Sequence, residues 1–323
     1  MRFIFFLLHL SLFAADFDCI LVGSSPFSLF EALYQCHSGK KVLILEADSR
    51  CGGAWKGIDV CGVAYADLGC HQVGQNVHLK SFIEEYAGCH IVSMDNPLLP
   101  FESGKSKNGW YFSKGCYELI DHLLTLIAQT DITLLTEHKV EKVSVDLGQK
   151  IAIVQTKNRL FTTDQLILTP MSSLSFHPSI EMQNFKKSKY FHLYLLVQDP
   201  TEPRFTYRAG GAQGVSRMMN LSHFTGLAGT GRHLIVIQTH NEQSLANGQA
   251  FLDALKKNHL IDQTAYILKE ESYIYETGTL HQGLIAQMGA QEIIQILQTG
   301  HFDTISQYIP KWKKAMKPYN SMF

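Results

Sequence analysis

The sequence lacks the cysteine spacing of zinc sites and of disulfide frameworks. Its seven cysteines all lie between Cys19 and Cys116, no two of them form a C-x-x-C pair, and their number is odd. We therefore expect free, mostly buried thiols and no metal site.

An excess of charge of one sign is also missing. Lysine and arginine number 28 and aspartate and glutamate 29, with no basic run typical of nucleic-acid binding. The cluster from Lys311 to Lys317 is interpreted as a solvated helix end, so no nucleic-acid partner is expected. The Gly-x-Ser-x-Gly pattern of a hydrolase nucleophile elbow is absent as well.

Only one long apolar run occurs near the N-terminus, and it is too short for a comfortable membrane span. Arg2 precedes the apolar residues from Phe3 to Phe13, and Ala14-Ala15 follows. This order is typical of a signal peptide over residues 1–15 and predicts an exported or membrane-associated protein. The alternative is an uncleaved segment that anchors the chain near a membrane or packs on the domain. If the segment is not a signal, a cytoplasmic location is expected.

Residues 18–53 carry the most informative pattern. The apolar run from Cys19 to Val22 predicts a buried parallel strand, and a turn that begins at Gly23 leads into a predicted helix from Pro26 to Ser38. Lys41 to Glu46 predicts a second buried strand. A βαβ unit that ends in a carboxylate is typical of a dinucleotide site, where the acid meets a ribose hydroxyl.

The glycine motif of this unit is incomplete. Of the three glycines in G-x-G-x-x-G only Gly23 is present, while Ser25 and Ser28 occupy the other two positions. The second glycine normally lets the backbone approach the pyrophosphate. Ser25 adds a hydroxymethyl group there, although its hydroxyl is able to donate to a phosphate. From this turn alone, nucleotide binding and a plain α/β packing unit remain open.

Further motifs follow in a fixed order. They are Arg50-Cys51-Gly52-Gly53, Asp67-Leu68-Gly69-Cys70-His71, Lys114-Gly115-Cys116, and a strand from Thr163 to Thr169-Pro170. This set resembles the superfamily of FAD-dependent amine oxidases, protoporphyrinogen oxidases and phytoene desaturases. In that superfamily the motifs R-x-G-G, D-x-G-x-H, K-G-G and D-x-V-I-x-A-x-P occur in this order. The resemblance covers residues 16–170 and becomes thin afterward.

The resemblance implies an FAD cofactor and a set of residues that hold it. Glu46 would bind the adenosine ribose, Val140 would contact the adenine through its backbone, and His71 would be the catalytic candidate near the flavin. Without the resemblance, His71 would be interpreted as a structural histidine. Near the C-terminus, Gly300 and a predicted helix from Ile305 to Lys314 would return to the cofactor. The remaining implied cofactor contacts are Gly23, Ser25, Pro26, Arg50, Gly52, Gly53, Asp67, Gly69 and Thr169.

The predicted fold class is α/β, a Rossmann-type FAD-binding domain with an inserted mixed-sheet substrate domain. A length of 323 residues with 46% apolar content suits about two domains. We assign residues 16–72, 113–170 and 281–323 to the FAD-binding domain, and residues 73–112 and 171–280 to the substrate domain. In the latter, Tyr190–Val197 and His233–Thr239 predict strands, Ala246–Asn258 a helix and Gly210-Gly211 a hairpin turn. Tyr111, Arg217 and Tyr275 are candidate substrate contacts.

The predicted function is an FAD-dependent oxidoreductase that removes a hydride equivalent from a C–N or C–C bond of a small organic substrate. Two alternatives stay open: a degenerate, non-catalytic protein that binds a nucleotide or another partner, and a flavin-dependent isomerase or mutase. The serines of the glycine motif and the short C-terminal part favour the non-catalytic alternative, while Glu46 and Gly52-Gly53 oppose it. An NAD(P)-dependent reductase would explain the first turn and Glu46 but none of the later motifs.

Overall fold

A computed structural model gives the structure of the chain. It describes residues 15–73, 76–94, 109–169, 175–177, 186–209, 215–243, 247–279, 289–297 and 305–322. The expected signal peptide therefore lies almost entirely outside the described residues. The chain divides into two compact units. Unit 1 comprises Met1–Gly53, Leu123–Lys187 and Gly278–Ser321; unit 2 comprises Ala54–His122, Ser188–Thr277 and Met322–Phe323.

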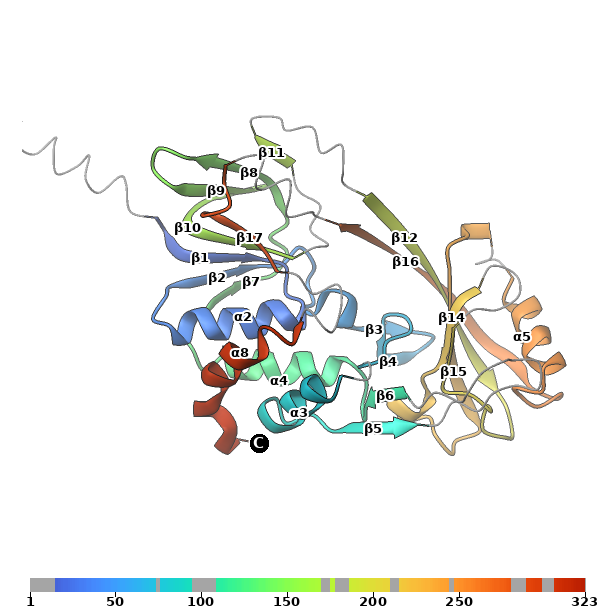
Figure 1. The fold of residues 1–323 in the computed structure, drawn as a ribbon. Coiled ribbons are helices and arrows are strands. Elements are labelled where there is room, and N and C mark those ends of the chain that lie inside the picture. Colours follow the sequence, from blue (N-terminus) through green and yellow to red (C-terminus); the bar gives the residue numbers. More distant parts are fainter. Residues whose placement is uncertain are drawn as a thin grey trace, which may run out of the picture. The chain divides into compact units, whose positions relative to one another are not determined.

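Unit 1 is built on an eight-stranded sheet of order β11-β8-β9-β10-β1-β2-β7, with β17 also paired to β10 (Figure 1). The pairs β7-β2, β2-β1, β1-β10, β10-β17 and β8-β11 are parallel, whereas the meander β8-β9-β10 is antiparallel. The strand bounds are β1 Phe17–Val22, β2 Val42–Leu45, β7 Thr133–Leu135, β8 Val140–Asp146, β9 Ile151–Thr156, β10 Leu160–Leu168, β11 Ser175–His177 and β17 Ile294–Ile296.

The predicted βαβ unit is present. Helix α2 spans Pro26–His37 between β1 and β2, with Ser25 as its N-cap and Ser38 as its C-cap. Pro26 fits the first turn because N–H groups there have no acceptor within the helix, so a proline loses no hydrogen bond at this position. The buried runs of β1 and β2 explain why neither strand alternates polar and apolar residues: both lie in the interior of a parallel sheet.

Helix α8, Ile309–Met316, packs on α2 through a buried ion pair. The carboxylate of Glu31 is fully buried and accepts hydrogen bonds from Trp312 Nε1 and from Lys311 Nζ, both at 2.8 Å. The indole of Trp312 stacks on Phe30 at 5.4 Å. Lys314 and Lys317 are exposed, as expected for a solvated helix end, whereas Lys311 is partly buried and paired with Glu31. The predicted helix start at Ile305 is too early, because the helix begins at Ile309, next to Pro310.

The main core of unit 1 packs the parallel strands against the meander. Ile20 on β1, Leu43 on β2 and Leu166 on β10 lie in one buried cluster with Val143 and Val154 of the meander. These side chains are almost fully excluded from water, and each buried aliphatic chain stabilises the fold by about 1.5–3 kcal/mol.

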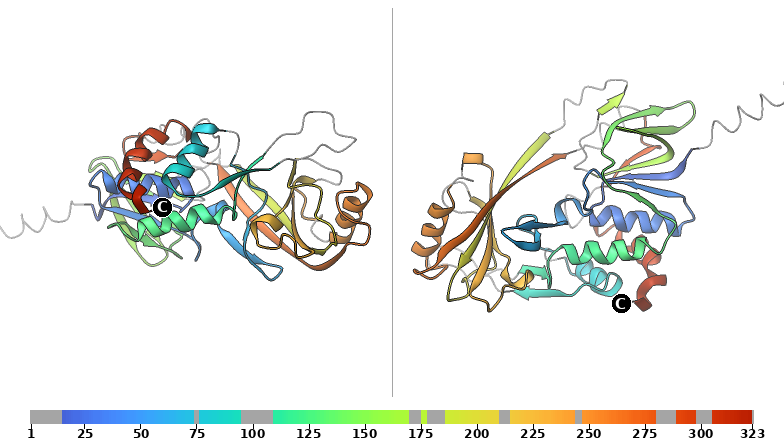
Figure 2. Two further views of the ribbon diagram at one scale, coloured as in Figure 1. Left: turned by 90° about the horizontal axis from the view of Figure 1, so that it is seen from below. Right: turned by 180° about the vertical axis from the view of Figure 1, so that it is seen from behind.

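Unit 2 contains a five-stranded antiparallel sheet of order β13-β14-β15-β12-β16. Helix α5, Gly248–Lys257, covers one face, and the hairpin β3-β4 lies against the other (Figure 2). The remaining described helices are α3, Val77–Tyr86, which belongs to unit 2, and α4, Tyr117–Ile127. The boundary between the units falls inside α4, after His122. The strand bounds are β3 Gly57–Val60, β4 Val63–Asp67, β5 Ile91–Met94, β6 Gly109–Phe112, β12 Lys186–Gln198, β13 Tyr207–Ala209, β14 Val215–Asn220, β15 Arg232–Thr239 and β16 Tyr266–Thr279; the short 3-10 segments are Gly53–Trp55, Ser222–Phe224 and Lys317–Met322.

The mixed α/β class, the strands β12 and β15 and the helix α5 are confirmed. The hairpin β13-β14 is also present, while its predicted turn at Gly210-Gly211 lies outside the described residues. Residues 54–72 and 113–122, assigned above to the FAD-binding domain, cluster with unit 2. The two units are defined by compactness, whereas the predicted domains are defined by binding of cofactor and substrate, so the domain assignment stays a prediction.

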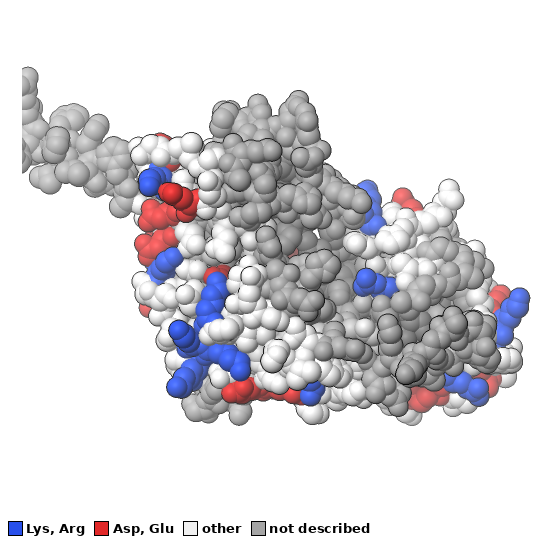
Figure 3. Space-filling view, viewed as in Figure 1, with Lys and Arg blue, Asp and Glu red and all other residues white. Residues whose placement is uncertain are grey.

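The charges on the surface are mixed. On the face in Figure 3, lysine and arginine side chains are interspersed with acids, and a basic group lies over α8, whose last turn carries Lys313 and Lys314. Among the described residues, no helix is long and apolar enough to span a membrane.

Candidate functional site

The turn after β1 requires glycine at its first position. Gly23 has φ +90°, a conformation that residues with a Cβ rarely adopt. A Cβ there would also lie 3.0 Å from Thr169 Oγ1, at the end of β10. The Gly23 N–H donates to Leu45 O at 2.8 Å. Gly23 and Thr169 therefore meet at the carboxyl end of the parallel strands, where open α/β sheets bind ligands.

Glu46 is held in this region by three donors. The N–H and the hydroxyl of Ser24 donate to Oε2 at 2.9 and 2.5 Å, and the Asp48 N–H donates to Oε1 at 2.9 Å. Both Ser24 and Glu46 are buried. Because an ionised carboxylate accepts at about four positions, Glu46 keeps room for one further donor such as a hydroxyl.

The Gly52-Gly53 turn is joined to the same residues. The Gly52 N–H donates to Ser24 Oγ at 3.0 Å, and Gly52 and Gly53 have φ values of +119° and +57°. A Cβ on Gly53 would lie 3.9 Å from Ser25 Cα, so this turn and the turn after β1 are neighbours. The single hydroxyl of Ser24 thus links the first turn, Glu46 and the second glycine turn.

Ser25 serves the helix that follows it. Its Oγ accepts from the Ser28 N–H at 3.3 Å and lies 2.9 Å from Ser28 Oγ, which makes Ser25 the N-cap of α2. Pro26 has no N–H, and the Ser24 N–H is used by Glu46. The helix N-terminus keeps its favourable dipole for an anion but offers fewer backbone donors than a full glycine motif would.

The other predicted contacts in unit 1 are placed less closely. Val140 is buried at the start of β8, after a segment in which the His138 N–H donates to Glu46 O at 2.8 Å. Arg50 is exposed. Gly300 lies outside the described residues. Unit 1 therefore brings together seven predicted residues: Gly23, Ser25, Pro26, Glu46, Gly52, Gly53 and Thr169.

In unit 2, two motifs that lie far apart in the sequence meet. Asp67, at the end of β4, is buried and accepts a hydrogen bond from the Cys116 N–H at 2.7 Å, just before α4. A Cβ on Gly115, which has φ +94°, would lie 2.9 Å from Asp67 Oδ1. Burial raises the pKa of Asp67 to about 6, and the Cys116 N–H opposes the shift. Asp67 therefore explains why a glycine precedes this helix.

Backbone groups hold His71 in place. Its Nε2 lies 2.7 Å from Leu68 O, and its ring lies 6.2 Å from the ring of Trp55. Burial lowers the pKa of His71, and hydrogen bonds to the backbone of Leu68 and Ala54 oppose this shift. Its catalytic role stays a prediction, because these contacts also suit a structural histidine.

Gly69 is fixed between two side chains of β12. Its N–H donates to Tyr194 Oη at 2.9 Å, and Tyr194 donates to Asp67 O at 3.0 Å. With φ +96°, Gly69 has its Cα against His192, where an added Cβ would lie 2.7 Å from Nε2. Gly69 thus fixes the segment from Asp67 to His71 on the sheet.

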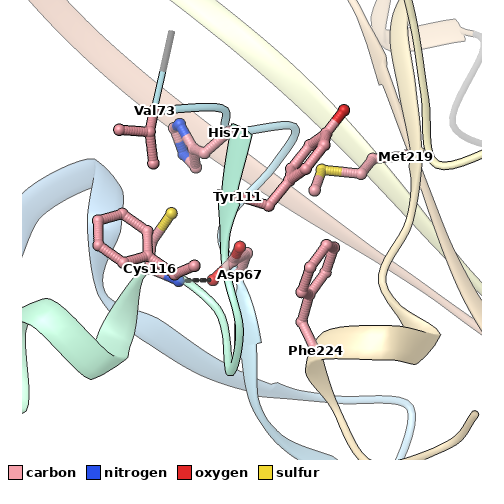
Figure 4. Close-up of a pocket in the computed structure, with 8 residues that line it drawn as sticks. Asp67, His71, Val73, Tyr111, Cys116, Met219 and Phe224 are labelled. Atoms are coloured by element: carbon pink, nitrogen blue, oxygen red, sulfur yellow. Dashed lines mark hydrogen bonds between the residues drawn. The ribbon is translucent and has the colours of Figure 1, made fainter. Parts of the chain in front are cut away.

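A small hollow in unit 2 is bordered by this segment. Figure 4 shows Asp67 with its carboxyl toward Cys116 and, nearby, Tyr111, Met219 and Phe224. The hollow is too tightly packed to admit a water-sized sphere. It is lined by Asp67, His71, Val73, Tyr111, Phe112, Cys116, Met219 and Phe224. Tyr111, which is 2% exposed, is one of these lining residues, and most of them are apolar.

Sequence reasoning missed two residues that the geometry makes prominent. Ser24 occupies a variable position of the glycine motif, and no pattern indicates that it links Glu46 to Gly52. His192 stands alone in the apolar run of β12, and that lone polar residue was a signal that could have been followed.

No family model matches this sequence, and no curated protein matches it either. Many solved structures, however, are similar in fold. The chain has an FAD-binding amine oxidase-like fold. Putrescine oxidase bound to putrescine is 10% identical with a TM-score of 0.63, over 94% of this chain and 99% of that one. Reduced UDP-galactopyranose mutase is also 10% identical, with a TM-score of 0.65 over 96% and 94%.

An oxidoreductase from Methanosarcina mazei is 13% identical, with a TM-score of 0.57 over 79% of this chain and 87% of that one. Identities this low establish the fold and leave the reaction open, because one fold hosts many functions.

Proposed function

We propose that this protein is an FAD-dependent oxidoreductase that removes a hydride equivalent from a C–N or C–C bond of a small organic substrate. The observation that carries the proposal is the hydrogen-bonded group Ser24, Glu46 and Gly52 at the carboxyl end of the parallel strands. The fold neighbours support it: one is an oxidoreductase, and putrescine oxidase is bound to the amine putrescine.

The residues of unit 1 fit the adenosine diphosphate part of FAD. Glu46 keeps an acceptor position for a ribose hydroxyl, and the N-terminus of α2 favours phosphate. Gly23 and the Gly52-Gly53 turn lack side chains where backbone must approach the cofactor. When bound, FAD supplies the electron-accepting isoalloxazine ring.

The chain's own residues would bind and orient rather than act as nucleophiles. In the first unit, Ser24 holds the Glu46 carboxylate and the Gly52 backbone in fixed positions before any ligand arrives. In the second, Asp67 holds the start of α4, and Gly69 holds the segment that presents His71. Burial lowers the pKa of His71, which favours its neutral imidazole.

The second candidate is a non-catalytic nucleotide-binding protein, and the N-terminus of α2 favours it. The Ser25 hydroxyl caps the helix and Pro26 removes one N–H, so phosphate would find fewer donors than in a complete glycine motif. This candidate shares the Glu46 site and differs only in the absence of turnover.

Reduction of bound flavin separates the two. The full chain, loaded with FAD, would be mixed without oxygen with a panel of amines, porphyrinogens and polyene precursors, and its visible flavin bands would be followed. Bleaching by at least one of these compounds supports the oxidoreductase. Stable flavin bands with every compound, although dithionite bleaches them, would favour the non-catalytic candidate or an isomerase.

A further inference from the structure

The five-stranded sheet of unit 2 carries a polar row at one end of an otherwise apolar face. His192 on β12 is paired with Gln238 on β15, and Gln238 is paired with Arg217 on β14, next to a register shift between Val215 and Arg217; beyond the shift the pairing is regular, with Met219 opposite Val236. These strands are adjacent in the sheet (Figure 1). Directly opposed residues in antiparallel strands project from the same face. The next residues along that face, Tyr194 and Val236, belong to a buried apolar cluster.

The row contains a buried polar atom without a partner. His192 is 3% exposed, and among the described residues none forms a hydrogen bond with its Nδ1. Nearly all buried polar atoms in folded proteins are paired, so an orphan of this kind indicates a partner that the polypeptide does not supply. The opposite edge of the ring, at Nε2, is covered by Gly69.

Charged groups next to the row also affect its histidine. Arg217 contributes to lowering the pKa of His71, and His71 contributes to lowering that of His192; burial is the main cause in both cases, and an interaction with the Gln238 side chain opposes the shift of His192. Arg217 itself is exposed, and no salt bridge to it is present within the described ranges. Asp67, the acid of the segment from Asp67 to His71, is engaged with Cys116.

We propose that Arg217, Gln238 and His192 form a subsite for an oxyanion, a carboxylate or a phosphate, carried by the substrate. A guanidinium binds such groups through two parallel hydrogen bonds, which a lysine does not reproduce. The amide of Gln238 and a protonated Nδ1 of His192 supply the further donors. The link to a substrate rests on the proposed function, whereas the anion site itself does not.

The chemistry of the neighbouring side chains narrows the ligand. Met219 and the partly buried Tyr273 and Tyr275 belong to the apolar cluster beside the row. A small organic acid with an apolar or aromatic body would place its charge on Arg217 and its body on this cluster. Inorganic phosphate carries a charge but no apolar group, so it tests the contact with Arg217 alone. An aromatic acid such as benzoate also tests the contact with the apolar cluster.

Calorimetric titration of the full chain at pH 7 with benzoate and with inorganic phosphate tests the subsite. The variant is Arg217→Gln, and Arg232→Gln is the matched control because Arg232 is an exposed arginine of β15 at the other end of the strand. We expect Arg217→Gln to weaken anion binding at least tenfold, about 1.4 kcal/mol, and Arg232→Gln to leave it unchanged. His192→Gln replaces the imidazole, including its Nδ1, with an amide and should also weaken binding.

Each outcome of these titrations either supports or overturns the proposed anion subsite. Benzoate binding tighter than phosphate binding, lost in Arg217→Gln, supports an organic acid, and the reverse order supports a phosphorylated ligand. No binding of either anion, or equal losses in Arg217→Gln and Arg232→Gln, overturns the subsite. Titrations with and without FAD separate the two proposals: an Arg217-dependent anion site in a protein that never binds FAD supports the subsite and removes only the flavin function.

Discussion

Two buried carboxylates, one in each unit, each accept a hydrogen bond from a residue just before a helix, and they are held differently. Glu46, near the start of α2, receives three hydrogen bonds, two of them from Ser24. Asp67, near the start of α4, is bonded by the Cys116 N–H, and burial raises its pKa to about 6. The carboxylate of Glu46 is therefore fixed by several donors, whereas the charge of Asp67, which has fewer donors, is destabilised by burial.

Glu46→Ala should have the largest effect. It removes the acceptor of two buried hydrogen bonds and one part-buried hydrogen bond and leaves the N–H groups of Ser24 and Asp48 without it. Since each unsatisfied buried group costs about 1–3 kcal/mol, we expect a loss of about 2 kcal/mol or more in the free energy of unfolding. FAD affinity should fall by about 100-fold, because a ribose partner is lost as well.

Urea unfolding and FAD titration measure the two effects. Glu46→Gln is the matched control, since it keeps one acceptor oxygen and should lose less on both measures. If Glu46→Ala binds FAD like the parent protein, Glu46 has no part in the site.

Asp67→Asn should change how stability depends on pH. The pKa of Asp67 is raised on folding from 3.8 to about 6, so the folded state binds the extra proton. The parent protein therefore loses stability relative to the variant as the pH rises from about 4 to about 6, by up to about 3 kcal/mol. The measurement is the difference between the two unfolding free energies across this range.

The difference between the two unfolding free energies is needed because the titration of His192 changes stability with pH in the opposite direction. Burial lowers its pKa to about 4, so its contribution to stability grows as the pH rises from about 4 to 6.5. That contribution is common to the parent and to Asp67→Asn and cancels. A difference that stays constant with pH would show that Asp67 is not strained by burial.

Ser24→Ala tests whether the hydroxyl of Ser24 is what distinguishes Glu46 from Asp67. The change removes a donor from Glu46 and the acceptor of the Gly52 N–H, and should cost about 1–3 kcal/mol of stability and about tenfold in FAD affinity. Ser38→Ala is the control, because the Ser38 hydroxyl is exposed and bonds only locally to Tyr34 O. Equal FAD affinity in both variants would contradict the role given to Ser24.

Ser25→Gly should have the smallest effect. Glycine is nearly as good an N-cap as serine, so stability should fall by only a few tenths of a kcal/mol. FAD affinity should stay equal or improve, since the motif gains its second glycine. A large loss of affinity would mean that the Ser25 hydroxyl is itself a phosphate ligand.

The sequence predicts the βαβ unit well because its strands are buried runs and its helix has marked ends at Pro26 and Gly39. It fails where side chains from distant segments meet. The bond from Ser24 to Gly52 spans 28 residues, and the polar row of His192, Gln238 and Arg217 depends on strand register. The ion pair of Glu31 with Lys311 was missed for the same reason, since 280 residues separate them.

The most direct test of the account is the visible spectrum of the purified full chain before and after addition of FAD, followed by release and identification of the cofactor. We predict flavin bands near one FAD per chain. A protein that is folded by circular dichroism yet stays colourless with excess FAD would contradict the account, because the Ser24, Glu46 and Gly52 group would then be a structural feature without a nucleotide.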